Sequence, residues 1–176
     1  MRTTFSIALL LMAAVACNPK TEEKQTATAT EKPAYAYSIN KPDNWDIVSD
    51  PTNTSIAMNA LKAFEDNKID ESASYFADTV HWRSDYMDMT VGKDSLKALF
   101  TDFRNGFTAF KVDMHDFESV ISKDKKDAWV TLWYVEHFTD KTGKSDSMAL
   151  INDLKIDKNK IVELNETVRH FPVKKP

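Results

Sequence analysis

The stretch that decides the fold is AWVTLWYVEHF, residues 128–138. It is rich in β-branched and aromatic residues, which favour a strand with two packed faces. Similar runs lie on both sides of it, at residues 109–121, 147–156 and 161–171. Charged breaks at residues 123–127, 140–145 and 157–160 separate these runs. This pattern is typical of antiparallel strands joined by short turns, so the sequence predicts a meander of four strands.

The chain before Gly106 has the spacing of helices instead. Asp50-Pro51 is a helix start signal, and a second, short helix is predicted behind the capping residue Asp70. Gly92 precedes a third helix, and residues 79–83 form a brief strand between the last two. Helices followed by a sheet within one domain predict an α+β fold with three helices packed on one face. The apolar residues that repeat at helical spacing are Ile56, Ala57, Ala60, Leu61, Phe64, Leu96, Leu99, Phe100 and Phe103.

The first residues have the order of a secretory signal. Arg2 precedes an apolar stretch that is too short to span a bilayer, and the stretch ends in Ala14-Val15-Ala16-Cys17. These four residues resemble the lipobox of bacterial lipoproteins, in which the cysteine takes a diacylglycerol and becomes the new N-terminus. The alternative is an ordinary signal peptide cleaved after Ala16, which would leave Cys17 as a free thiol. The lipobox interpretation predicts attachment to the membrane through Cys17, at the periplasmic face or the outer membrane of the cell envelope.

Three segments are therefore expected: a signal peptide at residues 1–16, a disordered tether at 17–49 and a folded domain at 50–172. The tether is rich in Thr, Glu, Lys, Ala and Pro, and poor in the large apolar residues that build a core. Because Cys17 is the only cysteine, stability has to come from packing and not from disulfides. The formal charge of −4 argues against a nucleic-acid partner, which would require a basic face.

Several segments in order give the chain a family resemblance. They are Ala60-Leu61-Lys62-Ala63-Phe64 with Asp66-Asn67-Lys68-Ile69-Asp70, then Tyr75-Phe76-Ala77-Asp78, Val91-Gly92-Lys93-Asp94 and Lys160-Ile161-Val162-Glu163. Together they resemble the SnoaL-like branch of the nuclear transport factor two-like superfamily. The resemblance implies a cone-shaped, cystatin-like α+β barrel whose curled sheet surrounds a cavity closed by the helices. Such folds serve as isomerases, dehydratases, cyclases, binding proteins and interaction modules, so the function has to be argued from the site.

The resemblance also implies which side chains line the cavity, because side chains alternate across a strand. On residues 128–138 it turns Trp129, Thr131, Trp133, Val135 and His137 inward. On the next strand it selects Met148, Leu150, Asn152 and Leu154, and on the last strand Leu164, Glu166, Val168 and His170. The short strand adds His81 and Arg83. The expected ligand-binding residues are Arg83, Trp129, Thr131, Trp133, Leu150, Asn152, Leu164 and Val168.

The steroid isomerases that share this fold show which residues proton transfer would require. Their base, tyrosine and protonated aspartic acid would fall on Arg83, Ala60 and Asn152, so that chemistry is not expected here. The segment Ile161-Val162-Glu163-Leu164-Asn165-Glu166 resembles one in which SnoaL-like cyclases carry an acidic residue. Glu166, desolvated among apolar side chains, would have a raised pKa and could transfer protons with His137 as its partner. Alternatively, Glu166 is a rim residue paired with Arg83, His137 or His170.

Three functions remain open at this level. The first is binding of a small apolar ligand without known turnover, and the second is a lyase, isomerase or cyclase that uses Glu166 and His137. The third is an interaction module that pairs with a second copy, as a homodimer, or with another envelope protein, through Tyr134, Phe138 and Ile151 on the convex face of the sheet. A metal site is not expected because the four histidines lack ligand spacing, and no cofactor motif occurs in the sequence.

Overall fold

The computed structural model describes residues 35–40 and 44–172. The contacts divide the chain into two units, and the second of these, Ile39–Pro176, holds the folded domain. The domain has three helices and seven strands. In chain order they are β1 (Trp45–Ile47), α1 (Thr52–Glu65), α2 (Ile69–Ser74), β2 (Phe76–Ser84), β3 (Met87–Gly92), α3 (Lys93–Asn105), β4 (Phe107–Ser122), β5 (Ala128–Asp140), β6 (Ser145–Asp157) and β7 (Lys160–His170).

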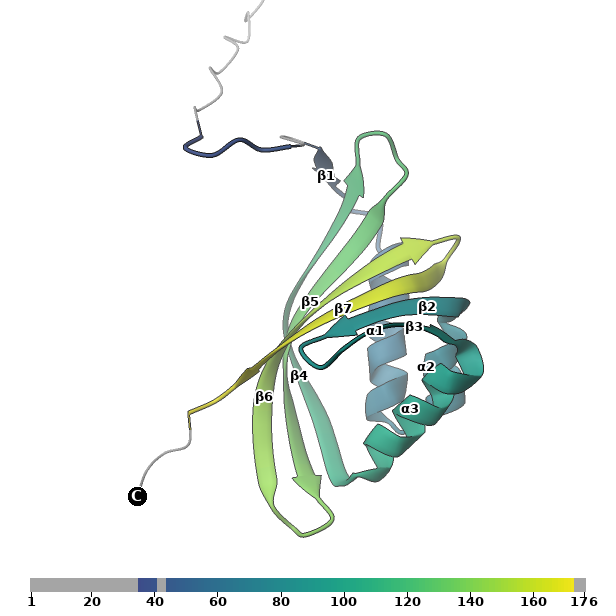
Figure 1. Cartoon of the computed structure of the whole chain (residues 1–176), viewed down its shortest axis with the longest axis vertical. Helices are drawn as coiled ribbons and strands as arrows, with labels where there is room; N and C mark the ends of the chain where they lie inside the picture. The colour runs from purple at the N-terminus through teal and green to yellow at the C-terminus, as the bar shows by residue number, and fades with distance from the viewer. Residues whose placement is uncertain (1–34, 41–43, 173–176) are drawn as a thin grey trace, which may run out of the picture. The chain divides into compact units, whose positions relative to one another are not determined.

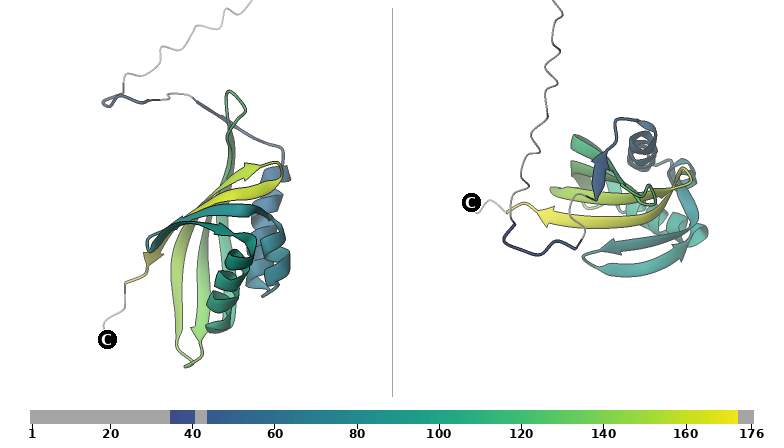
Figure 2. Two further views of the ribbon diagram at one scale, coloured as in Figure 1. Left: turned by 45° about the vertical axis from the view of Figure 1, so that its right-hand side comes forward. Right: turned by 90° about the horizontal axis from the view of Figure 1, so that it is seen from above.

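All seven strands form one curled sheet that does not close into a barrel (Figures 1 and 2). The strand order is β1-β4-β5-β6-β7-β2-β3. Strands β4 to β7 form an antiparallel meander, and β2 pairs with β7 in the parallel direction. The three helices lie together on the concave side of the sheet (Figure 1). This is the predicted α+β architecture, with its helices on one face.

The helices differ in the size of the side chains that they bury. α1 buries Ala57, Ala60 and Ala63, whereas α3 buries the larger Leu96 and Phe100. A hydrogen bond of 2.8 Å from the Ser72 hydroxyl to the Ala60 carbonyl oxygen ties α2 to α1. The small residues of α1 fill little of the space under the curled sheet, which leaves room for an internal cavity.

The three charged breaks of the sequence are the turns of the meander. Residues in the left-handed backbone region allow the tight reversals: Lys125, Gly143, and the pair Lys158 and Asn159. In the second turn one Asp140 carboxylate oxygen accepts hydrogen bonds from the backbone N–H groups of residues 142 and 144. The predicted positions of the four long strands therefore agree with the structure.

Two strands differ from the expectation. β3 pairs with β2 and forms the far edge of the sheet, although only the brief strand at residues 79–83 is predicted in this region. β1 pairs with the end of β4, so residues 45–47 belong to the sheet and not to the predicted tether at 17–49. β1 is exposed and three residues long, and its strand state depends on β4 as a partner, which a local pattern does not reveal.

The predicted signal peptide, Cys17 and most of the predicted tether lie outside the described residues. Among residues 35–40 and 44–172, no helix has the length and apolar character needed to cross a membrane.

Candidate functional site

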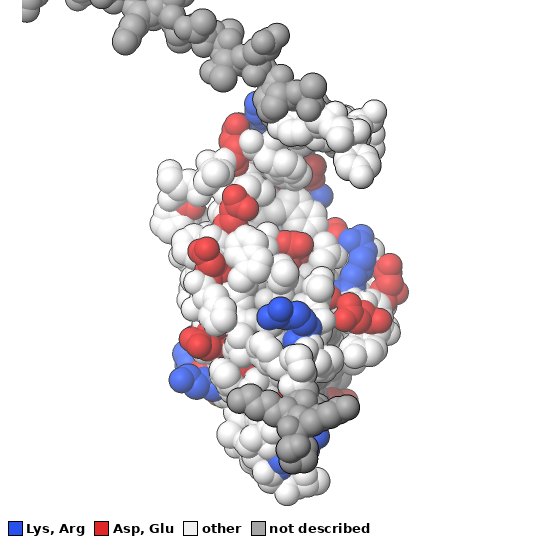
Figure 3. Space-filling model, turned by 90° about the vertical axis from the view of Figure 1, so that its left-hand side faces the viewer, with Lys and Arg blue, Asp and Glu red and all other residues white. Residues whose placement is uncertain are grey.

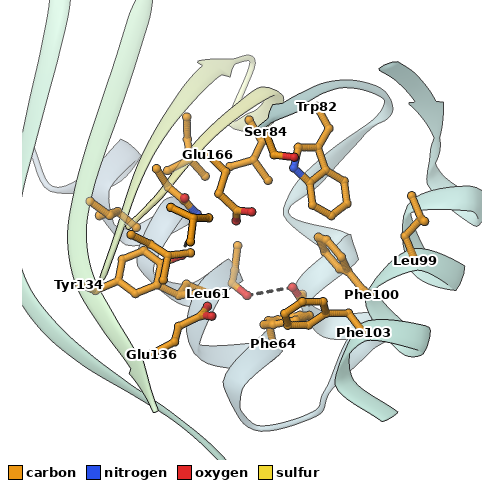
Figure 4. A pocket seen from close by; sticks show the side chains of 18 of the residues that line it. Leu61, Phe64, Trp82, Ser84, Leu99, Phe100, Phe103, Tyr134, Glu136 and Glu166 are labelled. Atoms are coloured by element: carbon orange, nitrogen blue, oxygen red, sulfur yellow. Dashed lines mark hydrogen bonds between the residues drawn. The ribbon is translucent and has the colours of Figure 1, made fainter. Parts of the chain in front are cut away.

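A cavity of about 570 Å³ lies between the concave face of the sheet and the helices (Figure 4). α1 and α3 contribute one wall, which includes Leu61, Phe64 and Phe100. Strands β5, β6 and β7 contribute the other wall. Tyr86, in the turn between β2 and β3, and His170, near the end of β7, belong to the lining and are exposed, so they mark the mouth.

The lining is mainly apolar, and eight of its residues are aromatic. On the helical side, the rings of Phe64 and Phe100 pack edge to face with centroids 5.2 Å apart, and Trp82 packs against Phe100 at 5.7 Å. Few polar side chains interrupt this surface. The sheet contributes Ser84, Tyr134, Glu136, Asn152 and Glu166, and α2 contributes Ser72.

Glu136 is the most unusual of these groups. It lies on β5, is only 4% exposed, and extends its carboxyl group into the cavity (Figure 4). Burial raises the pKa of Glu136 from 4.5 to about 8, and repulsion from Glu166 adds to this effect against a weaker attraction from Arg104. Its Oε2 atom has no hydrogen-bond partner among the described residues.

Glu166 enters the same cavity from β7 (Figure 4). Burial raises the pKa of Glu166 from 4.5 to about 7, and repulsion from Asp85 contributes. The sequence-based expectation of a desolvated Glu166 with a raised pKa therefore agrees with the structure. At neutral pH, Glu166 divides between its two protonation states, and Glu136 is mainly protonated.

Tyr134 and Asn152 form the polar pair between these acids. Asn152 Nδ2 donates a hydrogen bond of 2.9 Å to the Tyr134 hydroxyl oxygen, and both side chains are buried. Burial raises the pKa of Tyr134 well above its usual value, so the phenol stays neutral and retains a proton to donate. Asn152 Oδ1 has no partner within the described part of the chain.

The structure places five of the predicted site residues in the lining. Leu150 and Asn152 lie there on β6, and Leu164, Glu166 and Val168 on β7. Asn152 pairs with Glu166 across the two strands, and Leu150 pairs with Val168, so each pair shares the concave face. These residues are therefore brought together as the sequence analysis expected.

The residues of β5 require a correction, because Trp129, Thr131, Trp133 and His137 lie on the opposite, convex face. Thr131 donates a hydrogen bond of 2.6 Å to Asp153, and Lys155 lies over the Trp129 ring at 5.8 Å. His137 is exposed and lies 2.9 Å from the Ser147 hydroxyl, so it cannot be the partner of Glu166. The residues that face the cavity are Leu132, Tyr134, Glu136 and Phe138.

Arg83 is also placed outside the cavity, together with His81. The Arg83 guanidinium donates to Glu163 at 2.5 Å and to Asn165 at 2.9 Å, and His81 lies 2.6 Å from Asp88. Trp82 and Ser84 of β2 line the cavity in place of the predicted His81 and Arg83. The indole Nε1 of Trp82 is buried without a partner among the described residues.

A shift of one residue in the turn after β5 explains the inverted face. A turn over residues 140–145 would place Thr139 opposite Asp146, but the structure pairs Thr139 with Ser145. Leu132, and not Trp133, therefore lies opposite Asn152. Because side chains alternate along a strand, this shift turns every residue of β5 to the other face. The one acidic residue of this stretch, Glu136, thereby becomes part of the cavity.

The convex face also differs from the expected interaction surface. Ile151 lies there and is 40% exposed, but Tyr134 and Phe138 line the cavity instead. On this side of the molecule, acidic and basic side chains are scattered among larger uncharged areas (Figure 3). Within the described residues, no group of three or more His, Cys, Asp or Glu side chains is arranged to hold a metal ion.

The fold and the cavity define an α+β domain of the cone-shaped class with a mainly apolar internal site that opens at one mouth. The family model for the SnoaL-like domain matches residues 57–164, which is more than half of the chain. This chain therefore belongs to the SnoaL-like domain family. Among curated protein sequences, none matches it.

Solved structures share the fold at low sequence identity. AusH from Aspergillus nidulans is 16% identical with a TM-score of 0.57, and the match covers 69% of this chain and 86% of that one. An LEH-like epoxide hydrolase of M. tuberculosis is 12% identical with a TM-score of 0.53, covering 67% and 83%. A cystatin-fold protein of Novosphingobium aromaticivorans is 16% identical with a TM-score of 0.52, covering 65% and 96%.

The two buried acids predict how stability changes with pH. Above pH 4.5, folded Glu136 and Glu166 hold protons that the unfolded chain has released, up to about pH 8 for Glu136 and about pH 7 for Glu166. The contribution of these two groups to the free energy of unfolding is therefore highest below pH 4.5. It falls by roughly a few kcal/mol as the pH rises to about 8. Urea denaturation at pH 5, 6.5 and 8 measures this fall.

The double variant Glu136→Gln/Glu166→Gln should flatten this dependence and be more stable than the wild type at pH 8, because glutamine is uncharged. Glu118→Gln, at an exposed position of β4, is the matched control and should leave the dependence unchanged. An undiminished fall in the double variant would show that other groups cause it.

Proposed function

We propose that this domain binds a small, mainly apolar organic molecule in its internal cavity. The observation that carries the proposal is the cavity of about 570 Å³, with its aromatic lining and few polar groups. Sites of this volume and composition are typical of small-molecule binding. Three of the polar atoms around it, in Trp82, Glu136 and Asn152, are buried without a partner among the described residues, and a ligand would supply one.

The position of α1 supports this proposal. Ala57 and Ala60 belong to the lining, and their small side chains leave the cavity free on the helical side. Packed protein interiors contain few large voids, because a void loses dispersion contacts and burial energy. A cavity of this size therefore suits an occupant that restores those contacts.

Filling the cavity should weaken binding. Ala60→Leu adds three carbon atoms inside the lining, so we expect at least a tenfold loss of affinity for an uncharged apolar probe. N-phenyl-1-naphthylamine, whose fluorescence rises in apolar surroundings, is a suitable probe for a titration at pH 7.

Ala149→Leu is the matched control, because Ala149 pairs with Val135 on the convex face of the same sheet. It should bind the probe as the wild type does. Equal binding by both variants would place the probe outside the cavity and count against the proposal.

A second candidate function is proton transfer, in a lyase, isomerase or cyclase, and the two acids favour it. Their pKa values of about 7 and about 8 bracket neutral pH, which suits one base and one acid in the same site. Glu166 would take the proton, Glu136 would donate one, and Tyr134 would donate a hydrogen bond to a developing oxyanion. In this proposal Glu136 replaces His137, which lies on the other face of the sheet.

Deuterium exchange at the carbon next to the carbonyl of 2-methylcyclohexanone tests this role by NMR. The exchange should be faster than in buffer, rise with pH through about 7 as Glu166 ionises, and fall by roughly 10²-fold or more in Glu166→Gln. Exchange at the rate of buffer alone would remove the catalytic candidate and leave the binding proposal in place.

For the N-terminal segment, we propose that Cys17 carries a lipid that anchors the domain to the cell envelope. The support is the order of charged, apolar and small residues that ends in Ala14-Val15-Ala16-Cys17. A diacylated cysteine would hold the protein at the membrane through its buried acyl chains.

Cys17→Ser should abolish this anchoring. In detergent phase separation of cell extracts, the wild type should enter the detergent phase and the variant the aqueous phase. Mass spectrometry of the mature N-terminus gives the second readout. An unmodified thiol at Cys17 after cleavage behind Ala16 would support an ordinary signal peptide instead.

A further inference from the structure

The charges around the cavity are unbalanced. Its lining contains the carboxyl groups of Glu136 and Glu166 but, among the described residues, no lysine or arginine. His170 is the basic ring of the lining and stands exposed at the mouth. Asp85, in the turn between β2 and β3, adds a third acidic group near Glu166. A ligand that enters this site therefore meets a negative potential once the acids ionise.

Arg104, the cationic side chain that attracts Glu136, has another structural role. Arg104, at the end of α3, donates to the backbone carbonyl oxygens of Phe64 at 3.2 Å and Glu65 at 3.1 Å. Its guanidinium also lies over the Phe110 ring, 4.9 Å from the centroid. Arg104 thus satisfies the last carbonyl groups of α1 and leaves the two acids without an ion-pair partner in the described part of the domain.

The hydrogen-bonding groups of the cavity are also unbalanced. Among the described residues, Asn152 Oδ1 is a buried acceptor without a partner, and Glu136 Oε2 becomes a second one when its carboxyl group ionises; the two side chains are 7% and 4% exposed. Glu166 adds a further carboxylate acceptor when it is ionised. Trp82 Nε1, a buried donor without a partner in the described part of the chain, lies beside Ser84 on β2 (Figure 4). Once both acids have ionised, acceptors therefore outnumber donors on their side of the cavity.

Aromatic rings complete the surroundings. Phe64, Phe100, Phe103, Trp82 and Tyr134 surround the space into which the two acids extend (Figure 4). The faces of such rings attract cations within about 6 Å of their centroids. Aromatic walls combined with carboxylates suit a large, weakly hydrated cation, such as a substituted ammonium group, better than a metal ion.

We infer that the ligand is an organic cation: a substituted ammonium group that lies between Glu136, Glu166 and Asn152, joined to an apolar body that packs against the aromatic rings. This inference rests on the proposed binding function and names the ligand class of the same cavity. It holds whether the ligand is released unchanged or converted. Once the acids ionise, they repel an anion, and an uncharged ligand leaves their buried charges without a partner.

The affinity for such a cation has to rise with pH. Glu136 of β5 and Glu166 of β7 release their protons around pH 8 and pH 7, and the cation binds the ionised forms more tightly. The other groups around them are Asp85, Arg104, His170 and the neutral Tyr134. A fixed positive charge on the ligand removes any titration of the ligand itself.

Two compounds of nearly equal shape test the inference. Phenyltrimethylammonium carries a permanent charge, and tert-butylbenzene replaces its nitrogen with carbon. Each should displace N-phenyl-1-naphthylamine from the wild-type protein. We expect phenyltrimethylammonium to bind at least tenfold more tightly at pH 9 than at pH 6. The affinity for tert-butylbenzene should stay constant or decrease over the same range.

The double variant Glu136→Gln/Glu166→Gln is the decisive comparison, since it keeps the shape of the cavity and removes both charges. It should lose the pH dependence for phenyltrimethylammonium and still bind tert-butylbenzene. If the wild type binds only tert-butylbenzene, or binds both compounds equally at pH 9, the ligand is not a cation, although the proposed binding function stands. If neither compound displaces the probe, or Ala60→Leu leaves both affinities unchanged, the binding function itself is wrong.

Discussion

The cavity depends on one constraint, which is the register of three neighbouring strands. Leu132 of β5 lies opposite Asn152 of β6, and Asn152 lies opposite Glu166 of β7. Tyr134, Leu150 and Val168 form the next row in the same direction. Because paired residues share a face, these rows bring the polar groups of three strands into one interior. A shift of one residue in any of the three strands would turn its contribution outward.

The two faces of β7 place acidic side chains in opposite surroundings. Glu163 lies on the outer face and pairs with Arg83, while Glu166, three residues later, faces the interior together with Glu136. A paired, partly exposed acid costs the fold little, but an unpaired buried acid is destabilising once it ionises. The two buried acids therefore lower the stability of the domain when they ionise. Such a loss of stability is common where a binding or catalytic site contains unsatisfied groups.

The helices determine how much of the interior remains empty. α1 presents alanines to the sheet. Near its end, the Phe64 ring packs against two rings of α3, with centroids 5.2 Å from Phe100 and 5.9 Å from Phe103, and the three form an aromatic cluster. Phe100 is the buried member of the cluster, at 6% exposed, and the alanines keep the space beside it open. The same elements thus stabilise the domain and shape its site.

The sequence by itself determined the elements that depend on local patterns: three helices, four long strands, their turns, and Glu166 as a desolvated acid. It also gave the family, which the match over residues 57–164 establishes. It did not reveal β1 and β3, or which face of β5 points inward, and so it selected Trp133 and His137 in place of Tyr134 and Glu136. Both faces of β5 carry apolar residues, and strand alternation is relative, so the length of one turn decides the face. Only the tertiary structure fixes that length, through the pairing of Thr139 with Ser145.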